Sequence, residues 1–231
     1  MLKKIIFILI AFIYAKNNCF TQTTSGIATY EVMIGDDPRA LLREIDTQRL
    51  REAQSLSNEI SFNLYFTTKD CYFEIAEKPV NQNYFSPLFT EMATNHQGYD
   101  FYVDLTSSEF IYTLYNNYLN KTFTIKDQFD YNWQILEETK QIGKLLAYKA
   151  IGYNKYNKTI EAWFTPDIPT SAGPENYYGL PGLIIELQIG YTKYILKNVT
   201  LQDVTHKIKK IDDSNAVTEN EYREISKNSF K

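Results

Sequence analysis

Residues 163–186, WFTPDIPTSAGPENYYGLPGLIIE, form the most constrained stretch of the chain. They hold four of the seven prolines and three of the nine glycines. Since proline fixes φ and glycine opens positive φ, this composition specifies a single backbone path. Leu180-Pro181-Gly182-Leu183 has the residues of a type II turn, which predicts positive φ at Gly182 and a trans bond at Pro181. The stretch is therefore predicted to be a long, rigid connection.

Two core strands are expected on either side of this connection. Leu183, Ile184 and Ile185 begin an apolar run that is typical of a buried strand, and Trp163 and Phe164 close the strand before it. We therefore expect Trp163, Leu183 and Ile185 to be buried. Leu180 is expected at the exposed tip of the turn if this segment docks a partner.

The hexapeptide GLPGLI resembles the motif that names the GLPGLI family, secreted proteins of Bacteroidetes-type bacteria. Its residues here are Gly179, Leu180, Pro181, Gly182, Leu183 and Ile184. The flanking positions also resemble that family, namely Trp133, Trp163, Asp167, Pro169, Gly173 and Pro174. Many members carry a cysteine near Ala147, and its absence here excludes a disulfide at that place. Because the family has no characterised function, the resemblance implies an exported protein but names no reaction.

Residues 1–21 are predicted to be a signal peptide, followed by one domain over residues 22–231. Lys3 and Lys4 precede a short apolar run over residues 5–15, which is too short to span a bilayer of roughly 30 Å. Cleavage is expected before Gln22, so the mature protein is predicted to be periplasmic or secreted and not transmembrane. Lipidation at Cys19 is the alternative, but residues 16–18, KNN, differ from the small or aliphatic residues that lipoprotein signals carry.

Composition favours an antiparallel β protein. The 231 residues suit one domain, and nineteen tyrosines and fourteen phenylalanines favour strands over helices. Signal cleavage would remove three lysines and take the formal charge from −4 to −7, which argues against a nucleic-acid partner. Cys71 would be the one cysteine left, and we expect it to be a small buried residue. The fold must then depend on its hydrophobic core.

The order of predicted elements gives a mainly β, β-rich α+β fold. A helix is expected from Asp37 and Pro38 to about Ser57, with Arg49 either on the core edge or as an anion ligand. Residues 78–95 are expected to form a long loop or flap, and Thr218 and Glu221 have capping-box spacing before a short C-terminal helical tail. Strands are predicted at residues 26–34, 59–66, 71–76, 99–105, 109–115, 118–125, 133–136, 144–153, 159–165, 183–189 and 193–199. We expect one curved antiparallel sheet, or half-barrel, wrapped around the long helix; a closed β-barrel is the alternative.

The search for chemistry gives few candidates. His96 and His206 lie far apart and lack metal-ligand spacing, so both are expected at the surface, and we predict no metal site and no cofactor. Glu161, Glu175 and Glu186 are the candidate polar site, with Asp167 beside them. Carboxylates around a rigid turn could bind a cation or act as an acid/base pair. The alternative is that they cap turns or face water.

Three functional hypotheses remain open from the sequence. The first is an exported, non-catalytic cell-envelope protein that binds an apolar or peptide ligand in the concave face of the sheet, under residues 78–95. In the second, the segment at residues 163–186 docks an outer-membrane protein, which predicts that residues 166–182 are exposed and rigid and that the interior is filled. The third is a hydrolase-like enzyme, which requires the scattered carboxylates to converge in a cleft.

Overall fold

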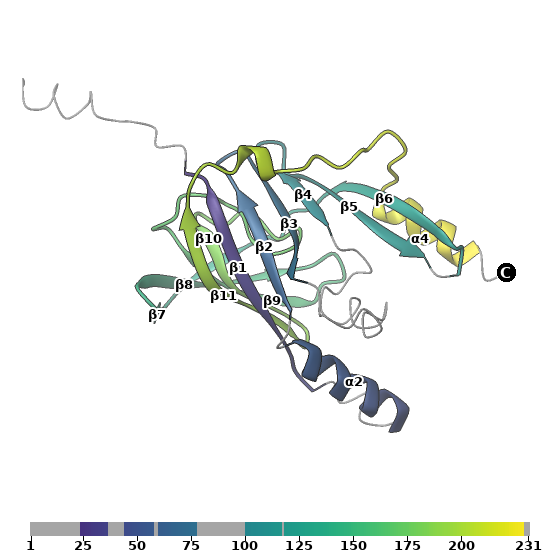
Figure 1. Cartoon of the computed structure of the whole chain (residues 1–231), viewed down its shortest axis with the longest axis horizontal. Coiled ribbons are helices and arrows are strands. Elements are labelled where there is room, and N and C mark those ends of the chain that lie inside the picture. The colour runs from purple at the N-terminus through teal and green to yellow at the C-terminus, as the bar shows by residue number, and fades with distance from the viewer. Residues whose placement is uncertain (1–23, 37–43, 58–59, 78–99, 117, 229–231) are drawn as a thin grey trace, which may run out of the picture.

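The chain folds into one curved, open antiparallel sheet of eleven strands (Figure 1). The structure is a computed structural model that describes residues 24–36, 44–57, 60–77, 100–116 and 118–228. The strands run in the order β6-β5-β4-β3-β2-β1-β11-β10-β9-β8-β7, so β6 and β7 are the two edges. This confirms the predicted curved sheet, and the closed barrel is wrong. The predicted leader, the loop at 78–95 and the side chain of Arg49 lie outside the described residues.

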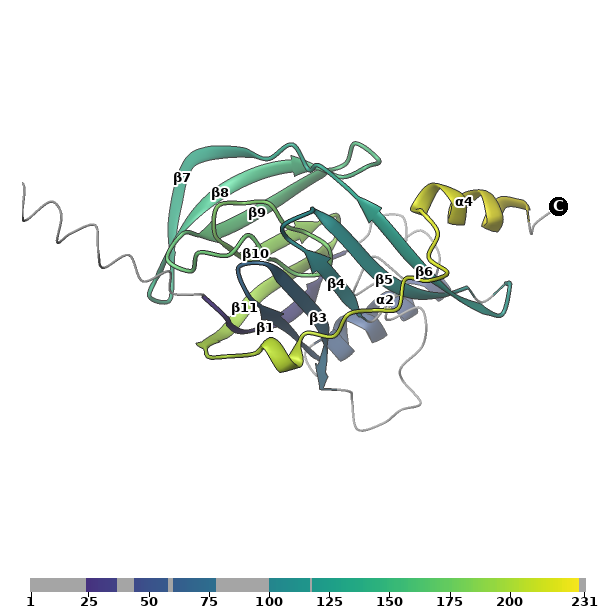
Figure 2. The ribbon, with the colours of Figure 1, turned by 90° about the horizontal axis from the view of Figure 1, so that it is seen from above.

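The first and last strands meet in the middle of the sheet, because β1 pairs with both β2 and β11. Two meanders extend from this centre, β2 to β6 on one side and β11 back to β7 on the other (Figure 2). The strands are β1 Gly26–Ile34, β2 Ser61–Phe66, β3 Asp70–Glu77, β4 Phe101–Asp104, β5 Glu109–Asn116, β6 Lys121–Gln128, β7 Gln134–Ile142, β8 Leu145–Tyr153, β9 Thr159–Thr165, β10 Leu183–Ile189 and β11 Thr192–Leu201. The helices are α2 Glu44–Ser57, η3 Thr205–Lys207 and α4 Glu219–Asn228.

The inner face of the sheet carries an aromatic core. Side chains alternate across a strand, so β1 turns Ala28, Tyr30 and Val32 to this face. Phe62 and Phe73 stack with their ring centroids 5.2 Å apart, and the ring of Tyr194 meets both edge-on at 5.6 and 5.7 Å. Cys71 is buried in the same cluster, as predicted. Burial of these large rings supplies much of the apolar area that stabilises the fold.

The connection between β9 and β10, residues 166–182, fills this inner face, and we call it the plug (Figure 2). Ile168, Ala172 and Leu180 are buried in the core cluster. Tyr178 ties the plug to the opposite meander, since its hydroxyl donates to Ser108 O at 2.6 Å. The hydroxyl of Thr170 also bonds to that meander, since it donates to Thr67 O at 2.7 Å. The plug therefore holds two halves of the sheet together across its concave side.

The described helix α2 contributes less to the interior than the sequence suggested. Its main neighbour is β1, and its Leu50 and Ala53 reach the core cluster. Figure 1 shows α2 at one end of β1. The plug carries more buried side chains than the described turns of α2. The sheet therefore wraps around the plug, and α2 lies at one end of the sheet.

The segment after β11 covers part of the outer face, and we call residues 202–217 the strap. Val204 of the strap is buried against Tyr65, Tyr72 and Tyr102 on that face. The strap then reaches the edge strand β6, where Val217 forms a bridge with Ile125. No helix in the described ranges is long and apolar enough to cross a membrane.

Helix α4 begins with the predicted capping box. The hydroxyl of Thr218 accepts from Glu221 N at 3.2 Å, and Thr218 N donates to Glu221 Oε2 at 2.7 Å. Tyr222 packs edge-on against Phe123 of β6 with the ring centroids 5.1 Å apart. The predicted C-terminal helix is therefore confirmed as part of the packed structure.

Candidate functional site

The GLPGLI hexapeptide forms a tighter turn than the predicted type II turn. Gly182 N donates to Leu180 O at 2.8 Å, a pattern that closes a three-residue turn around Pro181. The positive φ lies at Gly179, at 98°, so the prediction for Gly182 is wrong, whereas the Pro181 bond is trans as predicted. Glycine is required at 182 for space, because a Cβ there would lie 2.2 Å from Thr165 O.

The hexapeptide is part of the core. Leu180, Leu183, Ile184 and Ile185 are each at most 1% exposed. Trp163 is only partly buried, so its predicted full burial is wrong. The expectation that residues 166–182 are exposed is also wrong for most of the segment; Pro166, Asp167, Pro169, Gly179 and Pro181 are its exposed members. Substitution of Leu180 would thus disturb the core and cannot report on docking alone.

The motif flanks support the plug from several directions. Trp133 Nε1 donates to Tyr178 O at 2.8 Å, and a Cβ on Gly173 would lie 2.7 Å from Tyr177 O. Pro174 O accepts from Tyr177 N at 3.1 Å. These contacts pack the plug against its neighbours, while the single rigid conformation that its prolines and glycines indicate stays a prediction.

Glu175 is fully buried within the plug, in a strained backbone conformation and with only one of its two carboxyl oxygens hydrogen-bonded. Its φ is 55°, its Oε1 accepts from the Tyr194 hydroxyl at 2.6 Å, and its Oε2 has no hydrogen-bond partner in the described part of the chain. Burial raises the pKa of this carboxyl to about 8, although the bond from Tyr194 acts in the opposite direction. Glu175 is therefore mainly protonated at neutral pH. A strained, buried acid of this kind is a feature that recurs at functional sites.

Glu186 lies on the outer face within an ion-pair cluster. Its Oε2 is 2.7 Å from Lys140 Nζ and 2.9 Å from Lys193 Nζ. Burial acts to raise the pKa of Glu186, but the hydrogen bonds from these two lysines outweigh it, and the pKa is lowered. Glu186 is thus a buried anion with its charge compensated.

Trp163 and Glu161 extend this outer cluster. Lys140 Nζ lies 4.1 Å from the centroid of the Trp163 ring, which favours a cation–π contact. Trp163 Nε1 donates to Glu161 Oε1 at 3.2 Å, and Lys149 Nζ lies 3.2 Å from Glu161 Oε2. Lys140, Lys149 and Glu161 therefore each lie beside a side chain of opposite charge.

The three candidate glutamates do not meet. Glu161 pairs across the ladder with Gln188, on the outer face, whereas Leu187 and Tyr194 pair on the inner face. Glu175 bonds Tyr194 and so lies on the inner side, with the sheet between it and Glu186. The described residues contain no group of three side chains that could hold a metal ion. The positions of the three glutamates therefore do not form an acid/base pair.

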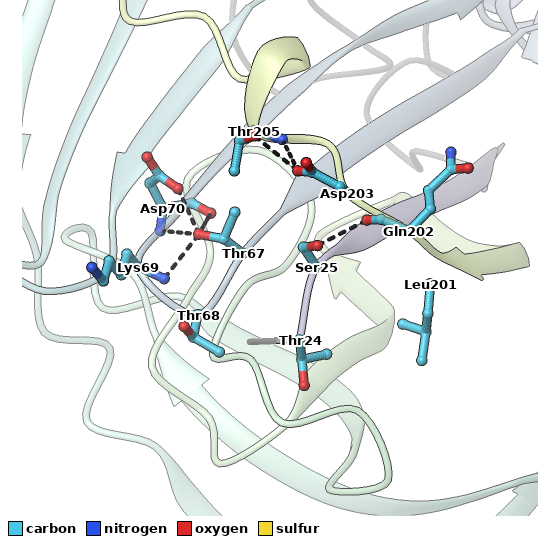
Figure 3. A pocket seen from close by; sticks show the side chains of 10 residues that line it. All are labelled: Thr24, Ser25, Thr67, Thr68, Lys69, Asp70, Leu201, Gln202, Asp203 and Thr205. Carbon is cyan, nitrogen blue, oxygen red and sulfur yellow. Dashed lines mark hydrogen bonds between the residues drawn. The ribbon is translucent and has the colours of Figure 1, made fainter. Parts of the chain in front are cut away.

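A groove of about 930 Å³, lined mainly by polar residues, lies at the end of the sheet (Figure 3). Three segments surround it: the residues before β1, the β2–β3 turn and the end of β11. Its lining is Thr24, Ser25, Thr67, Thr68, Lys69, Asp70, Leu201, Gln202, Asp203 and Thr205. Sequence reasoning missed this groove because no segment carries a recognisable motif. The signal present was the repetition of threonines at strand ends, TTSG and TTKD.

Hydrogen bonds within the groove fix its shape (Figure 3). The Thr67 hydroxyl donates to Asp70 Oδ1 at 2.6 Å, and Ser25 donates to Gln202 O at 2.8 Å. Asp203 Oδ1 accepts from the Thr205 hydroxyl at 2.8 Å. The pKa of Asp203 is lowered by its hydrogen bonds from the Thr205 backbone and hydroxyl, so it is ionised at neutral pH. The groove is therefore preorganised and carries donors and acceptors together.

Comparison with known proteins places a family match over the plug. A family model described as a protein of unknown function (Porph_ging) matches residues 152–186. The matched stretch contains the hexapeptide and agrees with the predicted resemblance to a family without characterised function. No curated protein matches the chain.

Two solved structures share the fold. PNGF-II in space group C2 is similar with a TM-score of 0.51 and 14% identity, over 89% of this chain and 33% of that one. PNGF-II in space group P21 gives a TM-score of 0.52 and 15% identity, over 89% and 34%. The chain thus spans about a third of PNGF-II. At this identity, the similarity concerns the fold alone.

Proposed function

We propose that this chain is an exported, non-catalytic protein of the cell envelope that binds a peptide in the groove at the end of the sheet. The observation that carries the proposal is the groove itself, about 930 Å³ in volume and preorganised by its own hydrogen bonds. This volume lies within the range of about 300–1,000 Å³ that is typical of ligand sites.

The concave face is a poorer location for the ligand. Tyr177, Tyr178 and Leu180 of the plug are buried there among the described residues. An apolar ligand would have to displace them, and with them the hydrogen bonds to Ser108 and Thr67. The ligand site of the first hypothesis is therefore proposed at the end of the sheet.

The lining of the groove suits a peptide. A peptide backbone offers alternating donors and acceptors, and the hydroxyls of Thr24 and Thr68 and the amide of Gln202 can supply both. Lys69 and Asp203 add opposite charges, which match the carboxylate and the amino group of a short peptide. Leu201, 60% exposed, offers an apolar contact at the rim.

The carboxylates of the groove are better suited to charge recognition than to proton donation. Asp203 is held ionised by its own hydrogen bonds, so it is a poor proton donor. Asp70 accepts from Thr67, which directs its Oδ1 into the turn. The groove thus supports charge recognition better than general acid catalysis.

The binding test uses a tryptophan to fill the groove. Thr68→Trp places a large ring in the lining, and Thr122→Trp is the matched control on another exposed threonine, on edge strand β6. The wild type and the control should retain peptides from a tryptic digest of envelope proteins, detected by mass spectrometry, whereas Thr68→Trp should lose them. Equal retention by all three proteins, with equal melting temperatures, would contradict the groove as the site.

Export rests on residues 1–21, which lie outside the described part of the chain. N-terminal sequencing of the secreted protein should begin near Gln22. A mature protein that starts at Met1, or one diacylated at Cys19, would contradict the proposed cleavage.

A further inference from the structure

A second cavity shares no lining residue with the groove and lies where the plug meets helix α4 and the β8–β9 turn. Its volume is about 40 Å³. Five aromatic side chains form most of its wall: Phe110, Phe129, Tyr131, Tyr156 and Tyr177. Tyr156 is 57% exposed, whereas Tyr131 and Tyr177 are at most 4% exposed. The cavity therefore runs from the surface at Tyr156 to the plug.

Two buried side chains of this cavity offer acceptors. Glu219, the first residue of α4, is 7% exposed, and its Oε1 accepts from the Tyr112 hydroxyl at 2.9 Å. Asn176 is 6% exposed and also lines the cavity, and its Oδ1 has no hydrogen-bond partner among the described residues. A buried acceptor without a donor carries an uncompensated desolvation penalty. The cavity is thus built for a group that donates hydrogen bonds and carries positive charge.

Lys155 supplies the positive charge in this structure. Its ammonium pairs with Glu219 Oε2 and lies 5.1 Å from the centroid of the Tyr156 ring. Burial and neighbouring Arg223 lower the pKa of the Lys155 amine to about 8, although Asp127 acts in the opposite direction. Lys155 leaves Asn176 Oδ1 without a hydrogen-bond partner, so it pairs with only some of the acceptors that line the cavity.

We propose that, when the Lys155 ammonium leaves Glu219, the cavity binds the primary ammonium group of an external amine between Glu219 and Asn176. Glu219 provides the counter-charge, Asn176 Oδ1 accepts an N–H bond, and the Tyr156 ring offers its negative face, as it does to the Lys155 ammonium here. A quaternary ammonium has no N–H and would leave Asn176 unpaired. The site therefore favours primary over quaternary amines.

Lys155 can leave without unfolding its turn. The Asn154 side chain holds this turn, since its Oδ1 accepts from Tyr156 N and Lys158 N, both at 3.0 Å. The Lys155 side chain is 27% exposed and contributes none of these bonds, so it can rotate into solvent. An incoming amine would then compensate the charge of Glu219.

The test titrates the full chain with methylammonium chloride and follows the Asn176 side-chain amide and the tyrosine signals by NMR. Tetramethylammonium chloride and sodium chloride at equal ionic strength are the controls. Wild-type protein should show saturable shifts with methylammonium that neither control reproduces. Identical shifts with all three salts would overturn the proposal, and this measurement requires no variant.

Two lysine variants separate the cavity from general charge effects. Lys155→Ala should bind methylammonium at least tenfold more tightly than the wild type, because the competing ammonium is gone. Lys158→Ala, an exposed lysine in the same turn, should match the wild type. Equal affinities for all three proteins would overturn the proposed role of Lys155. If Lys155→Ala does not fold, Lys155→Gln serves in its place and the wild-type titration remains decisive.

Discussion

The inner and outer faces of this sheet are stabilised in different ways. The inner face packs aromatic rings against a plug that is mostly buried, and Thr170 and Tyr178 of the plug bond to turns of the opposite meander. The outer face carries partly exposed lysines around Glu186 and Trp163, and a strap over Tyr72 and Tyr102. Inner contacts depend on shape and allow few substitutions. Outer contacts depend on flexible charged side chains, which can find water when a partner is lost.

The largest expected loss follows truncation on the inner face. Leu183→Ala should reduce the free energy of unfolding by about 2–5 kcal/mol, because Leu183 is fully buried and its removal leaves a cavity. Leu146→Ala is the matched control, since Leu146 on β8 is 40% exposed. Urea denaturation of both variants measures the difference. An unmoved midpoint for Leu183→Ala would contradict its place in the core.

Glu175→Gln should change how stability depends on pH. The pKa of Glu175 is about 8 in the folded chain against an ordinary value of 4.5, so folding retains a proton that the unfolded chain releases. The contribution is fully present below pH 4.5 and is lost as pH rises towards 8, at about 1.4 kcal/mol per pH unit.

Denaturation at pH 5 and pH 8 tests this prediction. The amide that Glu175→Gln introduces cannot ionise, so the variant should lose this part of the pH dependence and be the more stable protein at pH 8. Parallel pH profiles for the two proteins would show that Glu175 is not a buried neutral acid. Glu161→Gln, on the outer face, is the control.

Gly182→Ala tests the close approach of the plug to β9. The added Cβ would lie 2.2 Å from Thr165 O, so the two backbones must separate, at a cost of about 1–3 kcal/mol. Pro181→Ala should cost less, because Pro181 is exposed and mainly restricts the unfolded chain. Thermal melting of both variants compares them. A larger loss for Pro181→Ala would contradict the packing role of Gly182.

The smallest effect is expected on the outer face. Lys193→Ala should cost at most about 1 kcal/mol, because Lys140 remains 2.7 Å from Glu186 and both lysines reach solvent. The loss should shrink further in high salt. A loss as large as that of Leu183→Ala would show that the outer cluster is as demanding as the core.

Much of the fold could be predicted from the sequence, because local patterns specify it. Alternation along β1 and β2, the capping box at Thr218 and the rigid connection at 166–182 are properties of neighbouring residues. The burial of the plug could not be predicted this way. Proline and glycine show that a segment is rigid, but not whether it lies on the surface or in the core.

The candidate sites were harder to predict, because local patterns do not show which distant segments come together. The groove and the amine cavity each join segments that are distant in sequence, such as Thr67 with Asp203 and Lys155 with Glu219. Glu175 was singled out by its place in the rigid segment. The separation of Glu175 from Glu161 and Glu186 depends on which face of the sheet each residue occupies. The bulge in β10 between Ile184 and Glu186 shifts the alternation of side chains between the two faces.

Hydrogen exchange of the plug amides tests most directly whether residues 166–182 belong to the core. Gly179 N donates to Ser171 O within the plug, and Leu183 N and Ile184 N at the start of β10 donate to Ile168 O and Ala172 O of the plug, at 2.9 to 3.1 Å. If the plug is part of the core, these amides should exchange only through global unfolding, as slowly as the central amides of β1 and β11. Exchange that is orders of magnitude faster than in β1 would show that the plug opens as an ordinary loop, and would contradict the account.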